Sequence, residues 1–243
     1  MPNIATMARR ELGAYFLSPI AYAVNAVFLF SAGLAFALGT FQNGAEASLR
    51  SVLEFWIMMI LVFVLPMLTM RLLSEEFRSG TIETLMTVPI TEVELVLGKF
   101  FGAFGLYLFL LTTLLLYPLL LAIYGDVDGW LLVCNYLGLL LLGALYVSVG
   151  LFFSACTKHQ IVAVLLSFAL LVLMTFASAG LAQVVEGWPR ALLQHLSIRT
   201  HFFGFVRGMV ELNHVVFFLV YQTVFLFRTF NLLERNADDM CNL

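Results

Sequence analysis

Residues 71–94 read RLLSEEFRSGTIETLMTVPITEVE, the only long charged interruption in the first two thirds of an otherwise largely apolar chain. Within this stretch Ile82, Leu85 and Met86 fall at positions i, i+3 and i+4, the spacing of neighbours on one face of a helix. The pattern predicts a short helix that Pro89 stops, with one apolar edge. In a membrane protein, we expect such an edge outside the bilayer to contact a soluble partner.

The residues around this interruption also suggest where helices begin. The short helix would start after Ser79-Gly80. Thr91 and Glu94 have the spacing of a capping box, in which each side chain binds the other residue's backbone amide. They predict a second helix that continues through Lys99 into the next apolar stretch.

Composition places the whole chain in a bilayer. Of its 243 residues, 62% are hydrophobic and 11% charged, and the mean hydropathy is +1.01. One soluble core cannot bury so many apolar side chains. A helix needs about 20 apolar residues to cross the hydrocarbon core. We therefore predict an all-α, polytopic membrane protein with six transmembrane helices, at roughly 20–41, 53–72, 101–124, 131–153, 161–184 and 213–233.

The positive charges predict the orientation. Cytoplasmic loops are enriched in Lys and Arg. If both termini are in the cytoplasm, eight of the twelve Lys and Arg residues lie on the cytoplasmic side and four lie outside. The cytoplasmic set is Arg9, Arg10, Arg71, Arg78, Lys99, Lys158, Arg228 and Arg235. The net charge of −3 provides no basic surface for nucleic acid.

The first nineteen residues have their own pattern. An apolar sector that contains Tyr15 turns away from Arg9 and Arg10 when the segment is drawn as a helix. Ser18-Pro19 would end that helix, since a residue before proline avoids the helical conformation. We predict an interfacial helix on the inner membrane face; a frayed leader is the alternative.

Two further segments leave alternatives open. Gly98, Gly102 and Gly105 give the third span a small-residue edge that either receives another helix or reflects ordinary membrane composition. The segment between the fifth and sixth spans is too polar to cross the bilayer and too apolar for a free loop. It predicts two short amphipathic helices that either re-enter the outer leaflet or lie flat on it. Its candidate residues are Trp188, Pro189, His201, Phe202, Phe205 and Arg207.

The sequence argues against an enzyme. Gly98-Lys99 has no glycine five positions before Gly98, and Phe100 stands where a phosphate-binding loop needs Ser or Thr. No spacing typical of a metal site is present, and no ionisable residue lies well inside a predicted span. A carrier driven by an ion gradient is therefore disfavoured. If the chain moves a substrate uphill, the energy comes from outside the membrane.

The motifs resemble a known family. RSGTIETL at 78–85, followed by Pro89-Ile90 and LGKF at 97–100, resembles the signature of type-2 ABC exporter permeases. HFFGFVRG at 201–208 and LER at 233–235 are similar to the gliding-motility-associated branch of that family. The resemblance covers nearly the full length of the chain.

The resemblance implies a permease that dimerises, in a bacterial inner membrane, and docks separate ATPase subunits that bind Mg-ATP, while this chain itself holds no cofactor or metal. One transmembrane domain would fill the chain, with an interfacial helix at 1–19, spans at 20–72 and 100–184, a cytoplasmic coupling segment at 73–99, an outer re-entrant segment at 185–212, a last span at 213–233 and a tail at 234–243. The coupling residues would be Glu75, Glu76, Arg78, Ser79, Gly80, Thr81, Ile82, Glu83, Leu85, Met86 and Pro89. The alternative from another class is a membrane anchor of an envelope or motility complex that transports nothing.

Overall fold

The computed structural model describes residues 2–41, 56–80, 91–124, 128–178, 180–181 and 187–241, and this part of the chain is helical without a strand. The helices are α1 (Pro2–Leu17), α2 (Pro19–Phe41), α4 (Met58–Thr69), α5 (Arg71–Ser79), α7 (Glu92–Leu114), α8 (Leu116–Tyr124), α9 (Gly129–Cys156), α10 (Gln160–Val172), the π-helical turn η2 (Leu173–Ala177), α12 (Trp188–Leu196), α13 (Ile198–Val206) and α14 (Leu212–Cys241). The all-α prediction is confirmed.

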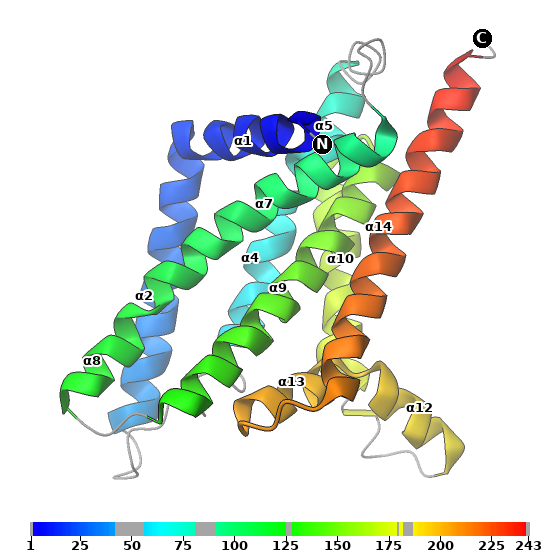
Figure 1. Ribbon diagram of the computed structural model, residues 1–243. Coiled ribbons are helices and arrows are strands. Elements are labelled where there is room, and N and C mark those ends of the chain that lie inside the picture. The colour runs from blue at the N-terminus through cyan, green and yellow to red at the C-terminus, as the bar shows by residue number, and fades with distance from the viewer. Residues whose placement is uncertain are drawn as a thin grey trace.

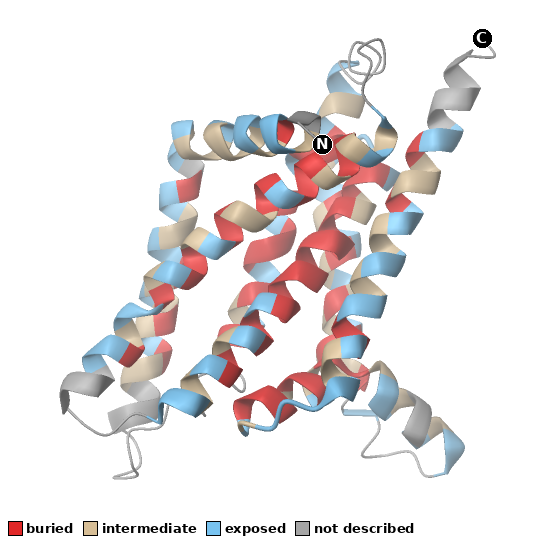
Figure 2. Ribbon diagram, viewed as in Figure 1, coloured by how far each residue is buried: buried red, intermediate tan, exposed pale blue. Residues whose placement is uncertain are grey.

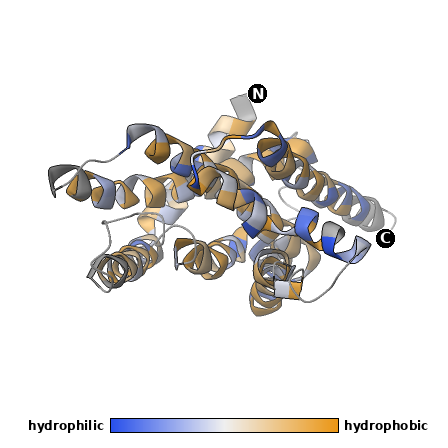
Figure 3. Cartoon of the chain, turned by 90° about the horizontal axis from the view of Figure 1, so that it is seen from below, coloured by the Kyte–Doolittle hydropathy of each residue, from blue (hydrophilic) through white to orange (hydrophobic). Residues whose placement is uncertain are grey.

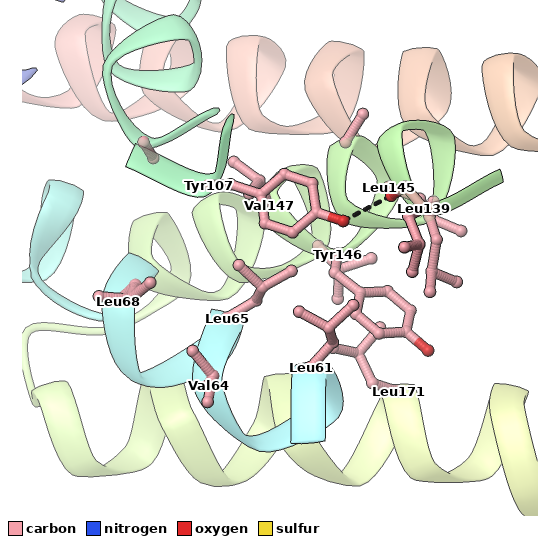
Figure 4. Packing of buried hydrophobic residues seen from close by; sticks show 14 of the residues in the cluster. Leu61, Val64, Leu65, Leu68, Tyr107, Leu139, Leu145, Tyr146, Val147 and Leu171 are labelled. Atoms are coloured by element: carbon pink, nitrogen blue, oxygen red, sulfur yellow. Dashed lines mark hydrogen bonds between the residues drawn. The ribbon is translucent and has the colours of Figure 1, made fainter. Parts of the chain in front are cut away.

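Helix α9 lies at the centre of the bundle. It packs against α4, α5, α7, α10, α13 and α14, and Figure 2 shows buried residues along most of its length. A helix that is apolar on every side is expected to be buried in this way. Close to its middle, the hydroxyl of the fully buried Tyr107 donates a hydrogen bond of 2.6 Å to the carbonyl of Leu139, and aliphatic side chains of α4 lie on one side of the Tyr107 ring (Figure 4).

Five helices of the described part are each long and apolar enough to cross a membrane, within Met58–Ser79, Glu92–Leu120, Gly129–Cys156, Gln160–Ala177 and Leu212–Arg235. The pair α1 and α2, bent by 73° between its two helices, would bring the number to six. Many large apolar side chains on these helices are exposed, and Figure 3 shows hydrophobic residues along most of them. The chain is therefore a multi-pass membrane protein.

The helix of the second predicted span continues beyond the predicted end of that span. The sequence suggested an end near residue 72, but the helix continues through α5 to Ser79, because Glu75, Glu76 and Arg78 are good helix formers as well as charged. Gly80 then ends α5 with φ of 73°, a left-handed conformation that glycine adopts without strain. The short helix predicted to start after Gly80 lies outside the described residues and stays a prediction.

Helix α7 begins where the sequence placed it. The Thr91 hydroxyl accepts a hydrogen bond from the Glu94 amide, and the Glu94 carboxylate accepts one from the Thr91 amide, both at 3.3 Å. The capping box is confirmed. Helix α7 then continues without interruption through Lys99 to Leu114, as predicted.

The join between α4 and α5 is held by α9. One turn after Pro66, between α4 and α5, the helix has a one-residue break at Met70, where the backbone angles stay helical. There the Ser154 hydroxyl of α9 accepts hydrogen bonds of 3.0 Å from the amides of Leu73 and Ser74, and donates one of 2.9 Å to the Met70 carbonyl. A single buried side chain thus satisfies backbone groups that an interrupted helix leaves open.

Figure 1 shows how the ends of the helices are distributed. Helix α1, the end of α5, the start of α7 and the end of α14 lie at one end of the bundle. Helices α12 and α13 lie at the opposite end. The described parts of the charged stretch 71–94, the end of α5 and the start of α7, therefore lie at the same end of the bundle as α1.

Candidate functional site

A buried cation joins three helices at the α1 end of the bundle. Lys99 of α7 is 1% exposed. Its Nζ atom lies 2.7 Å from Oε1 of Glu76 on α5 and 3.2 Å from Oε1 of Glu11 on α1. We call these three side chains the Lys99 triad. Since Lys99 sits between the two carboxylates, it neutralises one charge and reduces the repulsion between them.

The triad is held in place by the close approach of α1 to α7. Gly98, Gly102 and Gly105 face α1, and a Cβ atom on Gly98 would lie only 2.7 Å from the Cβ of Met7. The small-residue edge of α7 therefore receives a helix, which decides the alternative that the sequence left open. The helix it receives is α1 rather than another spanning helix. Any larger side chain on this edge would push α1, and with it Glu11, away from Lys99.

The predicted interfacial residues lie on two sides of α1. Arg9 and Arg10 are exposed, as their place outside the apolar sector predicted. Tyr15 is half-buried, and its hydroxyl donates a hydrogen bond of 2.8 Å to the Leu68 carbonyl of α4. Helix α1 is thus attached to α4 through Tyr15 and to α5 and α7 through the triad.

The predicted coupling residues are only partly covered by the structure. On α5, Glu75, Arg78 and Ser79 are exposed, while Glu76 faces inward to Lys99. The remainder, Thr81, Ile82, Glu83, Leu85, Met86 and Pro89, lie outside the described residues. Within the predicted coupling segment 73–99, the described parts are the end of α5 with Gly80 and the start of α7, and both lie at the α1 end of the bundle (Figure 1).

At the opposite end the two predicted short helices are present as α12 and α13. Pro189 stands in the first turn of α12, where its missing amide proton is not needed. Trp188 is exposed, whereas Phe202 and Phe205 of α13 are fully buried. Arg207 lies over the ring of Phe203, 5.2 Å from its centroid. Helix α13 packs on α9 and is thereby covered by protein, while the depth of either helix in a bilayer stays a prediction.

His201 belongs to a chain of polar groups that joins α13 to α14. Its Nδ1 lies 2.9 Å from Nδ1 of His214, and its Nε2 lies 3.3 Å from the His195 carbonyl. Nε2 of His214 lies 3.7 Å from the Glu211 carboxylate. The arrangement suits a neutral His201 that donates from Nε2 and accepts at Nδ1, because a second proton would set two N–H groups against each other.

We expect the contact between α13 and α14 to weaken in acid. Burial lowers the pKa of His201, so the unfolded chain binds a proton below about pH 6.5 that the folded chain resists. Stability should therefore fall as the pH falls, by about 2–4 °C in melting temperature between pH 7.5 and 5.5. His201→Phe should flatten this dependence in thermal melts of the purified protein. His159→Phe, at an exposed histidine, is the control and should leave the dependence unchanged; equal slopes in all three proteins would contradict the assignment.

Comparison with known proteins settles the family. Residues 36–198 match the family described as ABC-2 family transporter protein, which covers about two thirds of the chain. The chain belongs to this ABC-2 transporter family. No curated protein matches the chain significantly. The matched region includes the α4–α5 helix, the segment between α5 and α7, and the helices from α7 to α12.

Membership fixes a coarse role for this ABC-2 protein. The family comprises membrane components of ABC transporters, which have no ATPase activity of their own and work with an ABC ATPase. The prediction of a permease component without its own catalytic machinery is confirmed at this level. It agrees with the lack of a phosphate-binding loop at Gly98-Lys99.

Sequence reasoning missed two of the three charges in the ABC-2 protein's triad. Lys99 was assigned to the cytoplasmic charges and to the LGKF motif, and Glu11 was assigned to no site. Neither was recognised as buried or paired. The available signal was the glycine edge of α7: once α1 is seated on it, Glu11 lies opposite Gly102, one turn of α7 from Lys99.

Proposed function

We infer that this chain is the membrane-spanning subunit of an ABC exporter of a bacterial inner membrane, with both termini in the cytoplasm. The observation that carries the proposal is the Lys99 triad, which joins α5 and α7, the two helices between which residues 81–90 run, to α1. Helix α5 ends and α7 begins at the two edges of that segment. A partner bound there would act on both helices at once, and the triad would transmit the displacement to α1.

The proposed mechanism is a rigid-body movement. Closure of two ATPase subunits around Mg-ATP would push the coupling segments of two permease copies together, and the halves would rock to open outward. Lys99 contributes by keeping α1, α5 and α7 in fixed register, so that displacement is not lost in sliding between the helices. A second permease copy and the membrane lipids are the other expected partners. Membership of the gliding-motility-associated branch remains a prediction from the resemblance.

The test uses the apolar edge of the coupling segment. Replacing Ile82, Leu85 and Met86 together by Asp should reduce copurification of the ATPase at least tenfold, which is about 1.4 kcal/mol of binding free energy. ATPase activity stimulated by the permease should fall in parallel when the complex is reconstituted in proteoliposomes. The readout is the ATPase recovered per folded permease after affinity purification.

A control lies in the exposed turn between α9 and α10, outside the predicted coupling residues. His159→Asp adds one negative charge there without changing the apolar edge, and should leave copurification within about twofold of wild type. Unchanged recovery of an active ATPase with the triple variant would overturn the coupling role. A copurifying partner without ATPase motifs would instead favour the non-transporting anchor.

A further inference from the structure

A pocket of about 310 Å³ lies beside the Lys99 triad, between the end of α1, the start of α2 and the α4–α5 helix. Its volume is at the lower end of the range for sites that bind small molecules. The pocket does not depend on the transport function. It requires only that the chain spans a membrane.

Along the wall of the pocket formed by α4 and α5, the lining side chains change from apolar to charged. Met67, Arg71 and Glu75 line it at intervals of four residues and so share one helix face. At a rise of 1.5 Å per residue this face passes from apolar to cationic to anionic over about 12 Å. The side chain of Met67 is 54% exposed, so the apolar end faces the surroundings of the bundle.

The wall formed by α1 follows the same order. Tyr15 is hydrogen-bonded to the backbone of Leu68 at the apolar end, while Glu11 reaches Glu76 through Lys99 at the charged end. The polarity of the pocket therefore runs in one direction on both walls. Such an arrangement matches an amphiphile that lies with its chain toward α2 and its headgroup toward the triad.

The charges specify the headgroup further. Three carboxylates line the pocket against two cations, Lys99 and Arg71. Lys99 is engaged by Glu11 and Glu76, whereas Arg71 and Glu75 form no ion pair with another residue of the described ranges. One cation and one anion, a helical turn apart, are thus left for a ligand. An anionic headgroup would meet Arg71 and also the excess of carboxylates.

We propose that the pocket binds a membrane phospholipid whose headgroup carries a phosphate and a primary ammonium. The phosphate lies at Arg71, the ammonium at Glu75, and the acyl chains leave past Met67 into the bilayer. The order of these groups in the lipid, chain then phosphate then ammonium, is the order of their partners along the helix. A primary ammonium donates charge-assisted hydrogen bonds to carboxylates, which a trimethylated one cannot do.

The experiment compares lipids of one chain composition by native mass spectrometry of the purified full-length protein. Palmitoyl-oleoyl phosphatidylethanolamine, phosphatidylcholine and phosphatidylglycerol are added at equal concentration. We expect phosphatidylethanolamine to be retained about tenfold more than phosphatidylglycerol at the same collision energy. Glu75→Gln should remove most of that preference. Glu234→Gln, at an exposed carboxylate of α14, should leave it intact.

Met67→Trp supplies an independent variant that fills the apolar end and leaves the charges in place. It should lower retention of phosphatidylethanolamine, and an unchanged melting temperature shows that the variant is folded. Equal retention of phosphatidylethanolamine and phosphatidylglycerol by the wild type, or an unchanged preference in Glu75→Gln, would overturn the site. Phosphatidylcholine retained as well as phosphatidylethanolamine would overturn the primary-ammonium assignment.

Discussion

A Lys99→Met variant is expected to lose about 3–5 kcal/mol of stability, which is the usual cost of removing one partner from a buried ion pair. Methionine fills a similar volume but leaves Glu11 and Glu76 without their shared cation. Their carboxylates are only 20% and 18% exposed, so water cannot restore what is lost. Against a total stability of about 5–15 kcal/mol, little folded protein should survive purification. The yield and melting temperature in detergent measure the effect.

The second lysine of the chain is the matched control. Lys158 is exposed between α9 and α10, and Lys158→Met should change the melting temperature by no more than about 1 °C. Adding Glu11→Gln and Glu76→Gln to Lys99→Met should recover part of the loss, because the repelling charges are then gone. If the two lysine variants behave alike, or if the glutamine changes recover nothing, the triad does not hold these helices together.

A Gly143→Ala variant is expected to cost about 3 kcal/mol, more than most substitutions of such small size. Gly143 of α9 lies directly against the ring of Tyr107, and an added Cβ would overlap three of its ring carbons. The ring is completely buried, so it cannot rotate into open space. Making room for the methyl group would displace the ring and break the hydrogen bond from Tyr107 to Leu139, shown in Figure 4. Thermal melts in detergent report the loss.

Gly13→Ala in α1 is the corresponding control. A Cβ at Gly13 would have no other atom within 4 Å. Alanine also favours a helix over glycine by up to about 1 kcal/mol. The control should therefore be neutral or slightly stabilising. A similar loss in both alanine variants would mean that helix propensity and not contact with Tyr107 governs Gly143.

The helices themselves were predictable because each uses a signal local to its own sequence. Apolar stretches long enough to cross a bilayer, the Thr91–Glu94 capping box and the Ser18-Pro19 break are of this kind, and the structure contains all of them. The continuation of the helix through α5 was not predicted, because the hydropathy falls after residue 72. Glu75 and Glu76 are polar but favour helix, and only the left-handed Gly80 marks the true end.

The candidate site could not be assembled from the sequence, because its members are distant along the chain. Eighty-eight positions separate Glu11 from Lys99, and twenty-three separate Glu76 from it. No periodicity relates a residue of α1 to one of α7. The glycine edge of α7 left open whether a helix packs there, and the three-dimensional packing was needed to identify that helix as α1. The role of Ser154 could not be predicted either, because nothing in the sequence distinguishes it from the other small residues near the end of the fourth span.

The three hydrogen bonds of Ser154 have a mechanical consequence. They attach the first turn of α5 to the most deeply buried helix of the protein, so α5 cannot swing about Met70 unless all three bonds break together. A force that a partner applies after Gly80 would therefore be transmitted from α5 to α9, and would not only bend the end of α5. The break at Met70 is thus a rigid joint, and we expect any bending that a partner induces to occur elsewhere in the protein.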